Sequence, residues 1–103
     1  MNKTKLFKTI EEQGWIIREG GEDIDICQYS PLGEDFFFTV SKKNIVKDII
    51  SYAEDFDADE HAEMWIEVRG KGGVPNSPRA LIKDADDIKQ MLVDLSNAVK
   101  EAL

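Results

Sequence analysis

The chain has 103 residues, a common size for one domain, and its 42% of hydrophobic residues are enough to close a single core. No apolar run approaches the roughly 20 residues that span a membrane, and the polar, lysine-containing start lacks the apolar segment of a signal peptide. The net charge of −8 and the lack of any basic stretch longer than one loop argue against direct binding of nucleic acid. The composition therefore predicts one globular domain over residues 1–103 that does not enter a membrane.

The single cysteine, Cys27, has no partner for an internal disulfide. Disulfides are rare in reducing compartments, so this usage predicts a cytoplasmic protein.

The first half of the sequence predicts one helix followed by three antiparallel strands. Leu6, Phe7 and Ile10 form a short apolar stripe, and Gly14 is a typical residue just beyond a helix end. A Gly-Gly pair at positions 20 and 21 predicts a hairpin with a two-residue link, and the segment 30–33 (Ser-Pro-Leu-Gly) predicts the next turn. The expected elements are a helix over 3–13 and strands over 15–19, 23–29 and 35–40.

The third of these strands carries an alternating pattern that predicts which side chains enter the core. Phe36, Phe38 and Val40 share one face of the strand, and Phe37 lies on the other. We therefore expect Phe38 to be buried and Phe37 to be either exposed or covered by a second layer.

The second half predicts a helix, a fourth strand and a final helix. Ser41 is a typical N-cap for a helix that ends near Phe56. In residues 61–69 apolar side chains alternate with charged ones, which predicts a strand, although a helix would also bring several of these residues together. Residues 70–76 contain three glycines and a proline and predict a loop.

The last segment has the clearest helical pattern. Ser77 as N-cap and Pro78 at the first helical position mark its start. Asp86 and its acidic neighbours leave open a break into two helices. Apolar residues recur at alternating spacings of four and three to the C-terminus, in the order Leu81, Ala85, Ile88, Leu92, Leu95, Val99 and Ala102.

Together these elements predict an α+β fold of order α-β-β-β-α-β-α. Its four-stranded, mostly antiparallel sheet would carry the helices on one face. Because three helices would compete for that face, the surplus apolar residues of the last helix predict a homodimer through the C-terminal helix. The alternative is a monomer whose last helix wraps over the sheet edge and the first helix. These surplus residues are Ile82, Met91, Val93, Ala98 and Leu103.

Three alternating acids, Asp55, Asp57 and Asp59, match the opening of a calcium-binding loop. The match then fails, because Glu60 stands where the loop needs glycine and Ile66 stands where it needs glutamate. The single histidine, His61, and Cys27 are too few for a zinc site, and no nucleophile motif surrounds Cys27. We therefore expect no enzymatic activity, no metal and no cofactor.

Two other segments are candidate binding sites. A possible interaction surface combines the acidic block with a tryptophan that is either a partner contact or a core residue. Its residues are Asp55, Asp57, Asp59, Glu60, Glu63, Trp65 and Glu67. A glycine-rich basic loop before the last helix is a possible anion site, or a connection whose charges balance the acids. Its residues are Arg69, Lys71, Gly72 and Gly73.

Two stretches carry a resemblance to known sequences. They are residues 28–35 (QYSPLGED) and residues 52–75, which include YAEDFDADEHAEMWIE and RGKGGVP. They resemble a family of small acidic proteins of gut bacteria and their phage or mobile elements. The resemblance implies a bacterial, cytoplasmic protein with an accessory role, and it assigns no site residue.

The leading functional hypothesis is a non-enzymatic protein-interaction or regulatory module. It would bind a protein partner of unknown identity through the acidic surface or the last helix. One alternative is an acidic DNA mimic, whose carboxylates would occupy the basic cleft of a nucleic-acid-binding protein. The other is a small anion- or metal-binding protein.

Overall fold

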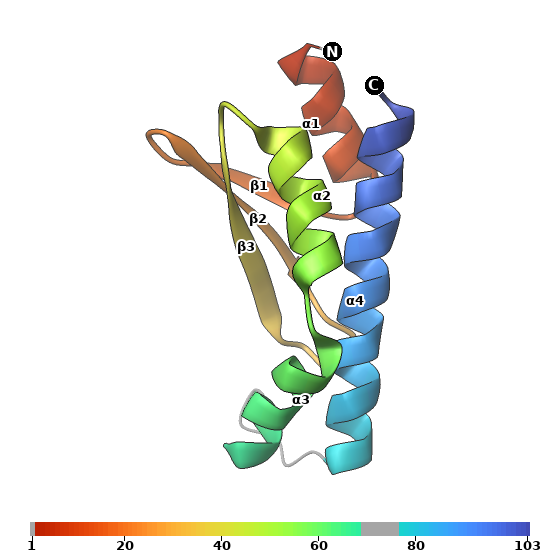
Figure 1. Cartoon of the computed structure of the whole chain (residues 1–103). Coiled ribbons are helices and arrows are strands. Elements are labelled where there is room, and N and C mark those ends of the chain that lie inside the picture. Colours follow the sequence, from red (N-terminus) through yellow and green to blue (C-terminus); the bar gives the residue numbers. More distant parts are fainter. Residues whose placement is uncertain (1, 69–76) are drawn as a thin grey trace.

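Seven elements follow one another along the chain in the order α-β-β-β-α-α-α (Figure 1). The structure is a computed structural model that describes residues 2–68 and 77–103, with extents of 43 × 25 × 20 Å. The elements are α1 (Lys3–Glu12), β1 (Ile16–Glu19), β2 (Asp23–Tyr29), β3 (Asp35–Ser41), α2 (Ile45–Asp55), α3 (Ala58–Glu67) and α4 (Pro78–Glu101).

The three strands form one antiparallel sheet in the order β1-β2-β3. The expected hairpin joins β1 to β2, but its link has three residues, 20–22, rather than two. Helices α1, α2 and α4 lie against one face of the sheet, and α3 lies beyond its end beside the first turns of α4 (Figure 1). Among the described helices, none lies over the opposite face of the sheet.

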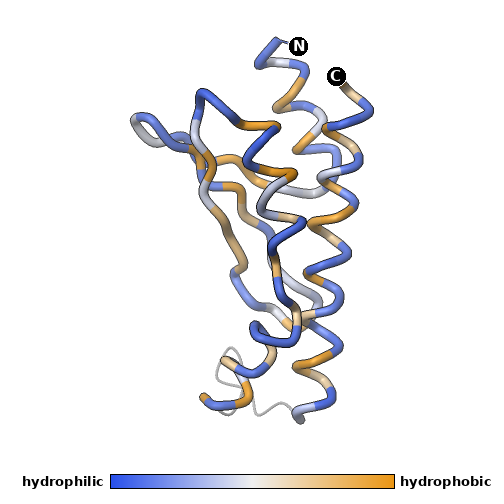
Figure 2. Tube along the Cα trace, viewed as in Figure 1, coloured by the Kyte–Doolittle hydropathy of each residue, from blue (hydrophilic) through white to orange (hydrophobic). Residues whose placement is uncertain are grey.

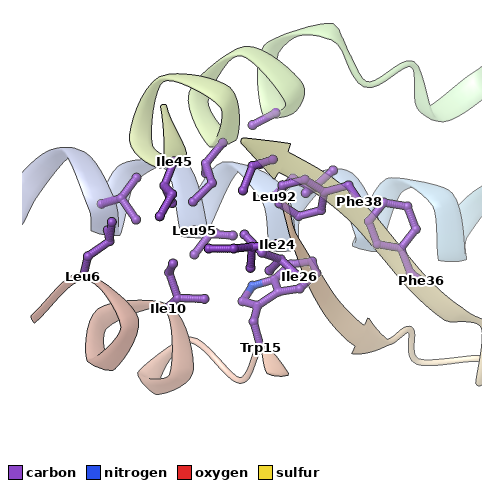
Figure 3. Close-up of a cluster of buried hydrophobic side chains, with 14 of the residues drawn as sticks. Leu6, Ile10, Trp15, Ile24, Ile26, Phe36, Phe38, Ile45, Leu92 and Leu95 are labelled. Atoms are coloured by element: carbon purple, nitrogen blue, oxygen red, sulfur yellow. The ribbon is translucent and has the colours of Figure 1, made fainter. Parts of the chain in front are cut away.

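Apolar side chains of the covered face and of three helices form the core. Figure 2 colours hydrophobic residues orange along the trace of these elements. The predicted row of Phe36, Phe38 and Val40 is confirmed, because each is less than 5% exposed. Trp15 packs edge-on against Phe38, with ring centroids 5.7 Å apart. Figure 3 shows these rings beside Ile24, Ile26, Leu92 and Leu95.

The predicted fourth strand over residues 61–69 is wrong, and the sheet has three strands. Residues 58–67 form α3, because Asp57 accepts a hydrogen bond from the Glu60 backbone N–H (3.1 Å) and so caps a helix. Asp59 and Glu60 in the first turn add a favourable interaction with the helix dipole. Ala62 is the fully buried residue of α3, and the polar–apolar alternation along this segment does not correspond to two faces of a strand.

The predicted N-cap at Ser41 is also wrong. Strand β3 continues through Ser41, and α2 begins at Ile45. The Ser41 backbone N–H instead donates to the carboxylate of Asp48 (2.9 Å), which lies in the first turn of α2. The acid therefore ties the start of the helix to the end of the strand.

Helix α4 is one continuous helix of 24 residues, which settles the alternative of two helices. The side chain of Ser77 accepts a hydrogen bond from the Ala80 N–H (3.2 Å) and Pro78 follows it, as the sequence predicts. From Leu81 to Val99 the apolar stripe is at most 1% exposed at each position. The apolar stripe of α4 is thus buried in the core of its own chain.

Candidate functional site

A buried acid organises the end of the molecule where the β2–β3 turn meets α4. Asp84 is 2% exposed, and its carboxylate accepts hydrogen bonds from the Ser30 hydroxyl (2.8 Å) and the Leu32 N–H (3.0 Å). The Ser30 hydroxyl in turn accepts from the Glu34 N–H (3.0 Å). Hydrogen bonds to a charged group are stronger than neutral ones, so Asp84 fixes the turn that carries Glu34.

From that turn, Glu34 reaches α3. Both of its carboxylate oxygens lie 2.9 Å from Nε2 of His61, and the two side chains are 9% and 15% exposed. His61, which the sequence placed at the start of a fourth strand, is therefore a helix residue in a largely buried contact with a carboxylate. Asp84, the β2–β3 turn, Glu34 and His61 form a polar connection between α4 and α3.

Aromatic rings surround this pair. Tyr52 stacks on Phe38 with centroids 4.5 Å apart and an interplanar angle of 11°, and the His61 ring lies 5.2 Å from that of Phe56. Burial raises the pKa of the Tyr52 hydroxyl, and the nearby Glu34 carboxylate adds to the effect. Tyr52 consequently stays neutral at physiological pH.

Two hollows lie on either side of Tyr52 and His61. The first, of about 440 Å³, is here called the α2–α3 hollow and is lined by residues of those two helices and their link. Its lining consists of Tyr52, Asp55, Phe56, Asp57, Glu60, His61 and Met64. The second, of about 560 Å³, runs from Tyr52 and His61 past Trp65 to the edge of β3 at Phe37.

The acids of the predicted interaction surface lie on the α2–α3 corner. Asp55 ends α2, Asp57 caps α3, and all six are exposed. The six acids are Asp55, Asp57, Asp59, Glu60, Glu63 and Glu67. Trp65 does not share their exposure, because it is half-buried and lines the second hollow beside His61. Trp65 is thus neither fully in the core nor fully exposed.

The uncovered sheet face, here called the open face, carries an apolar row. Ile16 pairs with Cys27, and Cys27 pairs with Phe37, so the three residues cross the sheet side by side. Ile16 is 57% exposed, Phe37 56%, and Tyr29, two residues along from Cys27, 67%. Facing residues in an antiparallel sheet lie about 5 Å apart, so these side chains form one continuous surface.

Charged groups border this row. Asp25 and Arg18 are paired in the next row of the sheet, and Asp35 pairs with Tyr29 at its end. Cys27 is only 4% exposed between its larger neighbours. Burial raises the pKa of the Cys27 thiol; the nearby Arg18 cation lowers it in part, and the carboxylates of Asp25 and Asp35 raise it. The thiol is therefore a packed side chain of low reactivity.

The outer side of α4 offers less apolar surface than the sequence suggests. Met91 packs against the core, Val93 and Ala98 are half-buried, and only Ile82 and Leu103 are exposed. Those two lie near opposite ends of the helix, so they do not form one patch. The predicted dimer is untested. The main argument for it was unburied apolar surface along α4, and the structure buries the apolar stripe of this helix in the core of the same chain.

Sequence reasoning placed Phe37 on the face opposite Phe38, but it missed the row that Phe37 forms with Ile16 and Tyr29 and the connection from Asp84 to His61. The open face had a readable signal, since alternation around buried Trp15 places Ile16 opposite it. The Glu34–His61 contact had none, because the two residues are 27 positions apart. The predicted anion-binding loop of Arg69, Lys71, Gly72 and Gly73 lies outside the described residues.

Within residues 2–68 and 77–103, no three His, Cys, Asp or Glu side chains are placed to hold a metal ion. The helices of this part of the chain include none whose length and apolar character would let it cross a membrane. Comparison with models of protein families, with curated protein sequences and with solved structures found no match.

Proposed function

We propose that the protein is a non-enzymatic, cytoplasmic interaction module that binds a polypeptide partner through the open face. The observation that carries the proposal is the exposed row of Ile16, Phe37 and Tyr29 on a sheet face that no described helix covers. Exposed apolar side chains that form one surface are typical of binding sites, whereas single exposed residues are not. Aromatic residues are also enriched among residues that dominate binding energy.

Charge identifies the kind of partner. Among the described strand residues, the open face carries Asp23, Asp25 and Asp35 and one cation, Arg18, on a chain of net charge −8. A partner segment with apolar and basic side chains therefore complements it, and electrostatic attraction would speed their association. A second copy of this chain would bring the same carboxylates face to face, which is unfavourable.

A peptide-selection experiment tests this proposal. Random peptides are selected on the wild-type protein and counter-selected on a Tyr29→Ser, Phe37→Ser double variant. We expect the selected peptides to combine Lys or Arg with apolar residues, to lose at least tenfold in affinity for the double variant, and to bind more weakly at high salt. Leu103→Ser is the matched control, because Leu103 is equally apolar and 74% exposed but lies at the end of α4. Equal binding to wild type and double variant would refute the proposal.

A DNA mimic is the second candidate, and the exposure of every acid from Glu54 to Glu67 supports it. A surface of this kind would compete with DNA for a basic cleft. The two candidates differ in their critical residues. Neutralising Asp59, Glu63 and Glu67 to their amides would abolish mimicry but leave peptide binding at the open face intact.

Self-association through the C-terminal helix stays a prediction. A charge introduced into the α4 stripe, as in Leu92→Glu, would not test the dimer. Leu92 is fully buried in the core, so this change would disturb folding instead. Sedimentation equilibrium of wild type and Leu103→Ser is the suitable measurement, since Leu103 is exposed.

A further inference from the structure

The α2–α3 hollow combines aromatic walls with carboxylates, and its described lining contains no Lys or Arg. Its volume of about 440 Å³ lies within the range of small-ligand sites. We propose that this hollow binds an organic cation, an ammonium or guanidinium group that carries apolar substituents.

The walls are held in place before any ligand binds. Tyr52 is stacked on Phe38, Phe56 meets Phe36 edge-on at 5.7 Å and 89°, and His61 is held by Glu34. Rings fixed in this way lose little conformational freedom on binding, which favours affinity. The electron-rich faces of aromatic rings attract cations, and quaternary ammonium groups are commonly bound by such walls.

The electrostatics favour a cation over an anion. The N-terminus of α3 opens beside the hollow, and a helix N-terminus has a partial positive charge of about one half. Asp57 already caps that terminus, and Asp55 and Glu60 add two further carboxylates to the lining. These three carboxylates face a dipole of about half a charge, so the lining favours a cation over an anion.

The chemistry also favours an organic cation over a metal ion. A hard metal ion needs several oxygens converging on one point. No group of metal ligands of this kind occurs in the described part of the chain, the hollow included. The lining instead offers Tyr52, Phe56 and the thioether of Met64, which suit the apolar substituents of an alkylated amine or a lysine or arginine side chain.

Two-dimensional NMR titration tests the site with a charged probe and its neutral isostere. Choline and 3,3-dimethylbutan-1-ol have nearly the same shape, and only choline is charged. At constant ionic strength we expect choline to bind at least tenfold more tightly and to shift the amide signals of Tyr52, His61 and Met64. Equal affinities, or shifts elsewhere on the protein, would overturn the proposal.

Variants locate the charge that matters. Asp55→Asn with Glu60→Gln should weaken choline binding at least fivefold, whereas Glu101→Gln, an exposed acid at the end of α4, should leave it unchanged. Both residues of the double variant are exposed, and an unchanged amide spectrum outside the hollow would verify its fold. Equal weakening by the control would mean that the net charge, and not this hollow, attracts the cation.

A further titration, with two more probes, distinguishes the source of the cation. The N-acetyl methylamides of lysine and arginine stand for basic side chains of a polypeptide. Tighter binding of these amides than of choline would identify a protein ligand, and tighter binding of choline would identify a free alkylated amine. The hollow shares neither Tyr29 nor Phe37 with the open-face variants, so this site and the proposed function can fail separately.

Discussion

The two faces of the sheet are built from alternating residues of the same strands, yet they differ in how far their side chains are exposed. On the covered face Phe36 and Phe38 are 4% and 3% exposed, whereas Phe37 between them is 56% exposed on the open face. The covered face meets three helices and contributes to stability. The open face has similar hydrophobic residues but no helix over it in the described part of the chain, so its apolar side chains stay exposed. The comparison teaches that residue type alone does not separate stabilising from binding residues on this sheet.

Truncating Phe38 should give the largest effect. Phe38→Ala removes a buried ring that contacts Trp15 and Tyr52, and should lower the free energy of unfolding by about 3–5 kcal/mol. Phe37→Ala should cost less than about 1 kcal/mol, because its ring is mostly exposed. Urea denaturation of both variants measures the difference. A larger loss for Phe37→Ala would mean that the strand register is shifted by one residue.

The next largest effect concerns the contact between the sheet and the covering helix. Asp84→Ala removes two hydrogen bonds to a buried carboxylate and should destabilise the protein by about 2–4 kcal/mol. Asp94→Ala on the exposed side of α4 is the control and should cost far less. Denaturation curves provide the comparison, and hydrogen exchange should show faster opening at residues 30–34. Similar losses for the two variants would argue against a role of Asp84 in fixing the turn.

A smaller effect should follow from loss of the cap of α4. Ser77→Ala removes the acceptor for the Ala80 N–H and should cost about 1 kcal/mol, with Ser77→Asp retaining the stability. Thermal and urea unfolding of the wild type and both variants measure this loss of stability. An unchanged stability in Ser77→Ala would show that the helix start does not depend on this side chain.

The smallest expected effect concerns the rate at which Cys27 is alkylated. This rate is a specific probe of the open face. Because burial raises the pKa of its thiol, less thiolate is present, and alkylation by iodoacetamide should be slower in the folded than in the unfolded chain at the same pH. Phe37→Ala should accelerate alkylation by exposing the sulfur. A bound open-face peptide should slow it further. Identical rates in wild type and Phe37→Ala would show that the Phe37 ring does not cover Cys27.

Several features followed from the sequence because they depend on neighbouring residues. The alternation of β3, the cap at Ser77 and the stripe of α4 are local patterns, and the structure has all three. The error at residues 61–69 was also local. Alternation favoured a strand there, while the Asp57 and Glu60 spacing that starts α3 was a readable signal for a helix.

Only the tertiary structure decided what covers each surface and which distant side chains meet. The sequence places Phe37 opposite Phe38, but it does not reveal that no described helix covers Phe37, because coverage depends on where α2 and α4 pack. The same holds for Asp84 with Ser30, 54 positions apart, and for Glu34 with His61. Contacts between distant residues depend on chain topology rather than local periodicity, so the exposure of the open face and the α2–α3 hollow could be established only from the folded chain.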